Sequence, residues 1–372
     1  MKKNVRKHFH IILFFFLLSS AVFAGGEIDT NYVQKFKSLF SIKGFFLKNG
    51  FFYQITPQNN TLFTEKELVD AKVNYAANIP PLTGVSINIK GIGFTYIFKF
   101  TNDYLDTTSR IKSGFKQFQI NMYGKKFGFE AFYQDYSRFY FHYKGDEILL
   151  KDYNANIRAY QFGGTAIFIN NGKKFSYNAA FNQNQFQKKS VGSPLTVFGL
   201  RYSEISSTNL IPDSVKKYFH EYPDLHSNRN YSFILQQGYA YNLVKKYFYF
   251  SNALFVGVGI QNQVYESPTT KKNKIGVPIT ARGKSSAGYN GKIFFGGIYA
   301  NADLSQSKIK SLQTQQFQYT YGLFLGIRAI TLTKTKGQIK AEEKRKKQAQ
   351  KDAAIKAKED KKKAAQEKKK KK

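Results

Sequence analysis

Side chains able to carry out acid–base or metal chemistry are scarce in this sequence. After residue 24, histidine occurs only as His142, His220 and His226, and the chain has no cysteine. The lack of cysteine removes disulfides, thiolate catalysis and thiolate metal sites. For hydrolysis, His142 would need an orienting partner and a strand-borne serine beside it, and no pair in the sequence suggests that arrangement. We therefore predict that the protein is not an enzyme, with an outer-membrane lipid-modifying enzyme that uses His142 as the alternative.

One short segment gathers possible metal ligands. The sequence HEYPDLH supplies His220, Glu221, Asp224 and His226, which could converge if the segment folded back on itself. Their spacing matches no helix-face zinc motif. We interpret the segment as a solvated connection, and we predict no metal site and no cofactor.

A larger set of polar side chains recurs at every second position of strand-like segments. If the strands close into a barrel with their apolar sides outward, this set faces the interior. It could then form a hydrophilic path for a small solute, or fill the interior with hydrogen bonds to itself. The residues predicted to line the lumen are Gln117, Gln119, Asn121, Glu130, Ser176, Asn178, Asn182, Asn184, Gln236 and Arg328.

A basic turn is a further candidate. Lys188 and Lys189, with Ser190 and Ser193, could hold an anionic group at the rim of the barrel, and a solvated turn without a ligand is the competing interpretation.

The elements that must position these residues are strands. Between Arg229 and Gln261, apolar residues occupy one parity before residues 243–246 and the opposite parity after them, which indicates a long antiparallel hairpin with one apolar side. Residues 175–184 alternate most cleanly of all and are predicted to be a strand that follows a hairpin turn at 170–173. A change of parity at Gly91 suggests a β-bulge in one long bent strand. One strand is expected to run from Ala287 to Tyr299.

The strands are long and their polar sides are rich in amides and glycine, which favours a transmembrane barrel over a two-sheet sandwich. We predict an all-β fold, an antiparallel transmembrane β-barrel of about 12 strands, with 10 or 14 possible. Residues 211–222 are expected to form a short helix in a connection. With 12 strands, the turns at Gly124, Asn171 and Leu243 cannot all lie on the periplasmic side, where short turns belong. Either Ile275 to Arg282 is an extra strand and a second strand has been missed, or the turn at 243–246 lies outside.

The two ends of the chain differ from the middle. Residues 1–24 have a basic start, an apolar core and small residues before a cleavage point after Ala24, the pattern of a secretory signal peptide. Residues 25–333 are predicted to be the barrel domain. Residues 334–372 form a Lys-rich tail that we expect to be disordered or transiently helical, because it has i,i+4 charge pairs and no hydrophobic stripe. The predicted location is the outer membrane, with the tail in the periplasm.

Charge suggests partners for the tail. The chain carries a formal net charge of +34, of which +12 falls in the tail and +4 in the signal peptide. A nucleic-acid partner is the usual inference from such a balance, but export argues against it, so a cytosolic nucleic-acid binder remains only an alternative. We expect contacts with outer-membrane lipid and, through the tail, with cell-wall or anionic lipid groups, or else an inert solubilising end.

Three ordered motifs carry a resemblance. GYAYNLVKKYFYF, FSYNAAFNQNQFQKKSVGS and YNGKIFFGGIYA are similar to segments of the family catalogued as domain of unknown function 4421. The resemblance covers most of residues 44–330 and implies an exported outer-membrane barrel of Gram-negative bacteria, inserted by the barrel-assembly machinery. The last strand here ends in GIRAI, whereas such barrels usually end on an aromatic residue. Together with the alternation, the resemblance leads us to expect a narrow solute pore or a structural envelope protein.

Overall fold

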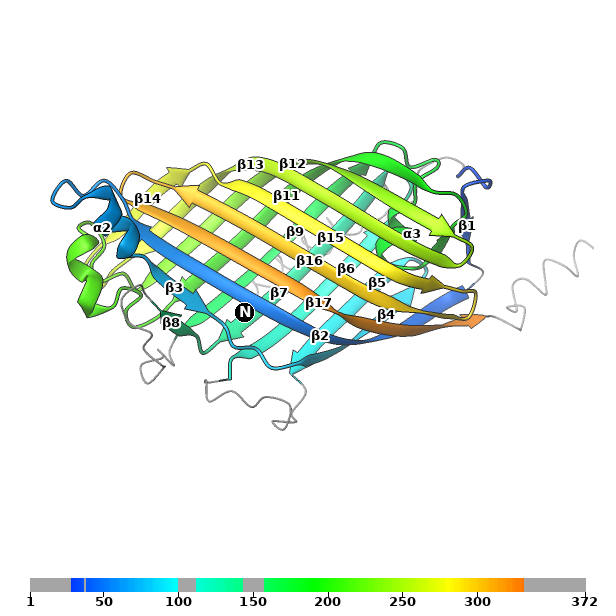
Figure 1. The fold of residues 1–372 in the computed structure, drawn as a ribbon, viewed down its shortest axis with the longest axis horizontal. Coiled ribbons are helices and arrows are strands. Elements are labelled where there is room, and N and C mark those ends of the chain that lie inside the picture. Colours follow the sequence, from blue (N-terminus) through cyan, green and yellow to red (C-terminus); the bar gives the residue numbers. More distant parts are fainter. Residues whose placement is uncertain (1–27, 37, 100–111, 143–156, 331–372) are drawn as a thin grey trace, which may run out of the picture. The chain divides into compact units, whose positions relative to one another are not determined.

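The computed structural model describes residues 28–36, 38–99, 112–142 and 157–330, and within them the fold is all-β (Figure 1). Twelve antiparallel strands form a closed barrel, because β17 pairs with both β16 and β2. The predicted count of 12 is confirmed. The barrel strands are β2 (Ser38–Pro57), β4 (Leu82–Ile89), β5 (Ile92–Lys99), β6 (Gly114–Tyr123), β7 (Phe127–Ser137), β9 (Arg158–Ile169), β11 (Val191–Ser206), β12 (Ser227–Lys245), β13 (Phe248–Glu266), β15 (Ile279–Asn290), β16 (Phe294–Lys308) and β17 (Leu312–Ile330).

The predicted hairpin is confirmed as β12 and β13, which pair along their whole lengths around a turn at Lys246 and Tyr247. Its apolar parity faces outward: Leu254 and Val256 are 71% and 66% exposed. The opposite parity faces inward, where Gln236 is buried. A closed sheet with a polar interior and an apolar exterior is the arrangement of a barrel that sits in a membrane.

The two ends of the barrel are built differently. At the turn end, β4–β5, β6–β7, β12–β13 and β15–β16 are joined by short turns, and β2 begins and β17 ends there. At the loop end lie the longer connections, which carry α2 (Glu65–Asp70), β3 (Val73–Ala76), β8 (Tyr140–His142), β14 (Lys271–Gly276) and the 3-10 helix η2 (Asp213–Tyr218). The helix expected within residues 211–222 is thus present as η2.

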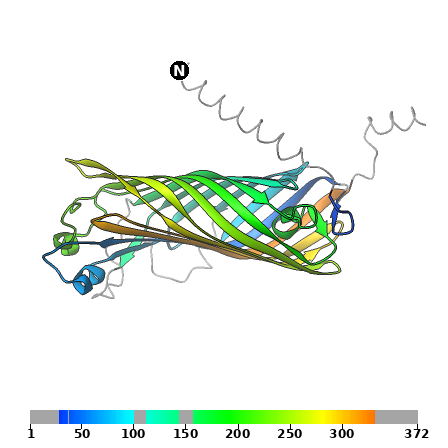
Figure 2. The same ribbon diagram turned by 90° about the horizontal axis from the view of Figure 1, so that it is seen from above.

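The strand predicted for residues 175–184 is wrong. Residues 177–181 form the helix α3 (Tyr177–Phe181), which lies inside the barrel at the turn end (Figure 2). Ser176 caps the helix, since its hydroxyl accepts a hydrogen bond from the Ala179 amide at 2.9 Å. Tyr177, Ala179 and Phe181 alternate like a strand, but lumen contacts decide the conformation of so short a segment.

This correction also resolves the topology. Because residues 175–184 are not a barrel strand, the turns near Gly124, Asn171 and Lys246 all lie at the turn end. The extra strand considered at Ile275 to Arg282 is present in part, because the barrel strand β15 begins at Ile279, whereas the turn near Lys246 lies at the same end as the other short turns. β14 pairs only with β13 and is not one of the twelve.

Two other sequence interpretations are corrected. The parity change at Gly91 is a two-residue turn between β4 and β5, where Lys90 and Gly91 both have positive φ, 51° and 94°. Such turns match the twist of adjacent strands, and they shift parity as a bulge would. The strand expected from Ala287 to Tyr299 is two strands, β15 and β16, separated by a turn at residues 291–293.

Apolar clusters occupy both ends of the interior. The loop-end cluster joins buried residues of β2, β3 and the 207–226 connection, including Phe51, Tyr75 and Phe219. The turn-end cluster joins α3 to the wall and includes Tyr177 and Phe255. The polar part of the lumen lies between them.

No helix among the described residues is long and apolar enough to span a membrane. The signal peptide and the tail predicted for residues 1–24 and 334–372 lie outside the described residues, and the 25–333 domain is described only in part.

Candidate functional site

A polar cavity of about 230 Å³ lies inside the barrel. Its lining comes from the barrel strands other than β4, β12 and β13, and from residues 181–183 at the end of α3. The side chains that matter below are Lys43, Gln117, Gln119, Asn121, Glu130, Gln134, Gln161, Asn182, Gln183, Arg201, Arg282, Lys284, Asp303 and Gln318.

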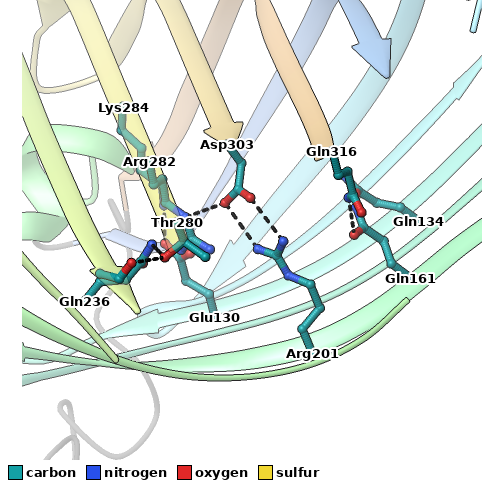
Figure 3. A network of polar contacts seen from close by, with 11 residues as sticks. Glu130, Gln134, Gln161, Arg201, Gln236, Thr280, Arg282, Lys284, Asp303 and Gln316 are labelled. Atoms are coloured by element: carbon teal, nitrogen blue, oxygen red, sulfur yellow. Dashed lines mark hydrogen bonds and ion pairs between the residues drawn. The ribbon is translucent and has the colours of Figure 1, made fainter. Parts of the chain in front are cut away.

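Asp303 is the centre of an ion-pair network that crosses this cavity (Figure 3). Arg201 on β11 forms two hydrogen bonds with its carboxylate, at 3.1 and 3.2 Å, and Arg282 on β15 donates to it at 2.9 Å. A carboxylate that accepts from two guanidinium groups is held in one orientation. The network therefore ties β11, β15 and β16 together from inside.

A second network surrounds Glu130 on β7. Its carboxylate accepts hydrogen bonds from Lys284 Nζ and Tyr123 Oη, both at 2.5 Å. Glu130 and Lys284 lie on opposite sides of the lumen in the strand order, so this pair also spans the interior.

Amides form a ladder toward the loop end. Gln134 donates to Gln117 at 2.8 Å, Gln161 donates to Gln134, and Gln316 donates to Gln161 at 3.1 Å. These side chains satisfy one another, as buried polar groups must.

Residues 171–190, which we call the plug, close the turn end of the cavity. Asn182 donates to Asn121 Oδ1 at 2.8 Å, Ser41 donates to Asn184 at 3.2 Å, and the plug's β10 (Gln185–Gln187) pairs with β1 (Val33–Lys35). Arg328 reaches the plug from β17 and donates to the Gln183 carbonyl. The plug is therefore held to the barrel strands through side chains. Its one strand, β10, pairs with β1, which is not a barrel strand.

The residues predicted to line the lumen fall into three groups in the structure. Gln117, Gln119, Asn121 and Glu130 line the cavity from the wall, and Asn182 lines it from the plug. Ser176, Asn178 and Asn184 belong to the plug and not to a strand, which corrects the element that carries them. Gln236 donates to Thr280 at 3.0 Å within the interior, and Arg328 is buried behind the plug.

The residues predicted to contact an anion all make local contacts in the structure. Lys188 Nζ donates to the Thr30 carbonyl at 2.8 Å, and Lys189 lies over the Tyr32 ring. Ser190 Oγ accepts from the Val244 amide at 2.9 Å, while the buried Ser193 Oγ accepts from the Asn171 amide at 2.9 Å. Each is used in local structure, and an anion site at these residues stays a prediction.

Sequence reasoning missed the charged side chains of the lumen. Lys43, Arg201, Arg282, Lys284 and Asp303 all line the cavity. A signal for two of them was present, because Thr280, Arg282, Lys284 and Ser286 share one parity of a strand. It was overlooked since residues 275–282 were not assigned firmly to a strand.

The residues considered for catalysis or metal binding lie at the loop end. In the HEYPDLH segment, Asp224 pairs with Lys216 at 2.8 Å, and the hydrogen bonds that the Lys216 amine donates to Asp213 and Asp224 raise its pKa. The backbone of His142 pairs with Asn74 of β3. Among the described residues, no group of three or more His, Cys, Asp or Glu side chains could hold a metal ion.

Solved structures with similar architecture are outer-membrane proteins. The outer membrane protease OmpT from Escherichia coli aligns at 6% identity and TM-score 0.39, covering 78% of this chain and 96% of that one. A mutant of the monoaromatic hydrocarbon channel TodX aligns at 9% identity and TM-score 0.27, with 78% and 90% covered. The toluene transporter TodX of P. putida aligns at 7% identity and TM-score 0.19, with 77% and 90% covered. No curated protein matches the sequence.

The expectation that the protein is not an enzyme is corrected by this comparison. The first of these structures is an outer membrane protease.

The family comparison covers most of the chain. The profile described as domain of unknown function DUF4421 matches residues 27–328, a range that contains the barrel strands almost entirely as well as the plug. The chain is an outer-membrane β-barrel that belongs to the DUF4421 family.

Proposed function

We propose that the barrel passes a small polar solute across the outer membrane, with the plug as a gate at the turn end. The observation that carries this proposal is the polar cavity of about 230 Å³ in the middle of the lumen. If the lumen side chains only filled the interior of a structural protein, we would expect no such cavity, because protein interiors without a ligand pack to high density.

The attachment of the plug supports a gate. Its contacts with the wall are side-chain hydrogen bonds, such as Asn182 to Asn121, and apolar packing around Tyr177, and both can break without separating any pair of barrel strands. The apolar loop-end cluster would block the solute at the other end of the lumen, so its side chains must also separate for passage. We therefore expect low conductance at rest and a rise when the plug moves.

Cross-linking the plug tests the gate. The chain has no cysteine, so Asn121→Cys with Asn182→Cys introduces the only two thiols, at side chains 2.8 Å apart. A short, reducible bis-methanethiosulfonate should abolish channel openings in planar bilayers, and reduction should restore them. The two single-cysteine variants treated with the same reagent are the matched controls.

Deletion of residues 175–184 provides the opposite test. Conductance should rise well above that of the intact chain. If the deleted barrel is folded and still passes no current, the solute pathway is refuted and a structural role in the envelope takes its place.

For the tail, we propose periplasmic attachment to cell-wall carboxylates or anionic lipid headgroups, on the basis of its net charge of +12. The remaining partners we propose are outer-membrane lipid and the barrel-assembly machinery, and not nucleic acid. Truncation after Thr333 should ease extraction of the protein from envelopes by salt. Unchanged extraction would contradict the attachment.

A further inference from the structure

The cavity lining is electrically unbalanced. It contains four basic side chains, Lys43, Arg201, Arg282 and Lys284, and two acidic ones, Glu130 and Asp303, for a net charge of +2. In a lumen of low dielectric, such an excess is costly unless an anion is present or one of the lysines loses its proton.

The two carboxylates already form ion pairs with other basic side chains of the lining. Asp303 accepts from both arginines, and Glu130 accepts from Lys284 and Tyr123. Among the described residues, Lys43 Nζ therefore has no carboxylate within ion-pair distance. Lys43 is thus the basic side chain of the lining that has no acidic partner there.

The surroundings of Lys43 leave it incompletely satisfied. The residue is 8% exposed, and its ammonium donates one hydrogen bond, to Gln183 Oε1 at 3.2 Å. The rings of Phe45 and Phe324 lie 5.1 Å from Nζ and supply cation–π contacts. An ammonium has three donors, so two remain for another acceptor.

Other lining groups lack partners as well. Gln318 Nε2 and Thr165 Oγ1 are buried without a hydrogen-bond partner in the described part of the chain. Both groups can donate a hydrogen bond, and a rotation of each side chain would turn the donor toward the cavity. The cavity is many times larger than the roughly 15 Å³ that one water needs.

We propose that the lumen contains a binding site for a small oxyanion, a phosphate or a small carboxylate, with Lys43 as its main contact. This inference rests on the solute pathway proposed above for its biological use, and it assigns the solute a negative charge. Binding itself needs only the cavity and can be measured without passage.

Equilibrium dialysis of the full chain in detergent against radiolabelled inorganic phosphate tests the site. Lys43→Met should weaken phosphate binding at least tenfold, and Lys43→Arg should retain it, because the charge stays in place. Lys292→Met is the matched control, since Lys292 is exposed in a turn at the same end. Acetate as competitor tells a carboxylate site from a phosphate site.

A measurement on the unaltered chain covers the case in which Lys43→Met does not fold. Phosphate should raise the temperature at which the barrel loses its compact form in electrophoresis, relative to chloride at equal ionic strength. No binding and no such shift would overturn the site, as would unchanged phosphate binding by folded Lys43→Met.

The two proposals fail separately. Phosphate binding in a barrel that conducts nothing after deletion of the plug would refute the pathway and keep the site. Conduction with the same anion-to-cation permeability ratio in the intact chain and in Lys43→Met, without phosphate binding, would refute the site and keep the pathway.

Discussion

Gln183 combines complete burial with an unfavourable backbone conformation. Its φ is 57°, in the left-handed region, and its side chain is 0% exposed. The amide accepts from Lys43 and donates to Tyr249 at 3.0 Å, while its carbonyl accepts from Arg328. Strain of this kind costs about 1–3 kcal/mol and persists only where the surroundings compensate for it. The compensation here comes from three barrel strands.

Two substitutions at this residue separate strain from hydrogen bonding. Gln183→Ala loses the amide and keeps the strain, whereas Gln183→Gly loses the amide and removes the strain. With Asn182→Cys as a reporter, thiol labelling should be roughly fivefold faster in Gln183→Ala than in Gln183→Gly. That ratio corresponds to about 1 kcal/mol of backbone strain, which the glycine variant lacks. Equal rates in both variants would show that the backbone conformation is not strained.

Arg328 should control how often the plug opens. It donates to the carbonyls of Gln183 and Gly291 and to Asn290 Oδ1, and its guanidinium lies 3.9 Å from the Phe36 ring centroid. Charged hydrogen bonds contribute about 1.5–3 kcal/mol each. Arg328→Met should therefore raise labelling at Cys-substituted Asn182 at least tenfold, with Lys292→Met as the control. An unchanged rate would mean that other contacts hold the plug.

The interior and exterior Arg–Asp pairs offer a matched comparison. Asp303→Asn leaves two arginines together inside the lumen, and removing one partner of a buried pair costs about 3–5 kcal/mol. Asp135→Asn breaks a pair whose Arg158 side chain is 56% exposed, which should cost about 1 kcal/mol or less. Urea unfolding in detergent micelles measures both. Similar losses for the two variants would contradict a water-poor lumen.

At the scale of elements, the plug depends on one close approach. A Cβ on Gly172 would lie 1.7 Å from the Lys125 carbonyl oxygen, which belongs to the turn between β6 and β7. At this contact, the chain leaves the end of β9, passes over the turn between β6 and β7 and enters the lumen. Glycine is required here for space.

Gly172→Ala should displace the plug without unfolding the barrel. The clash is with backbone, so the plug must move, and labelling at Cys-substituted Asn182 should increase. Gly44→Ala serves as the control, because a Cβ there would meet nothing within 4 Å. If both variants label like the parent chain, the approach of Gly172 to Lys125 does not fix the plug.

At the scale of the whole molecule, closure of the barrel depends on the pairing of β17 with β2. The last described residue, Ile330, ends β17, and the chain divides into units at this point, residues 1–329 and 330–372. The wall is therefore complete before the tail begins.

A chain that ends at Thr333 should fold to the same barrel. The strand pairings of the described residues all lie before residue 331, so the temperature at which the compact form is lost in electrophoresis should match that of the full chain. A marked decrease would show that the tail stabilises the barrel.

The sequence by itself determined the wall of this protein. In β12 and β13, for example, apolar Leu254 and polar Gln236 had to lie on opposite faces, because side chains alternate along a strand and only one parity tolerates lipid. That alternation was sufficient for the all-β class and the barrel architecture. The count of twelve was right although residues 175–184 are not a barrel strand and the segments around Gly91 and from Ala287 to Tyr299 are two strands each.

Only the tertiary structure decided the contents of the lumen. Residues 175–184 alternate as well as any strand, yet residues 177–181 fold as α3, and the following Asn182 and Gln183 bind Asn121 and Arg328 of the wall. Such lumen contacts outweigh the weak local preference of so short a segment. The partners of Lys43, Glu130 and Asp303 are likewise fixed across the barrel by strands far apart in sequence. Alternation assigns a side chain to the interior, but the register and closure of all twelve strands determine which side chain it meets there.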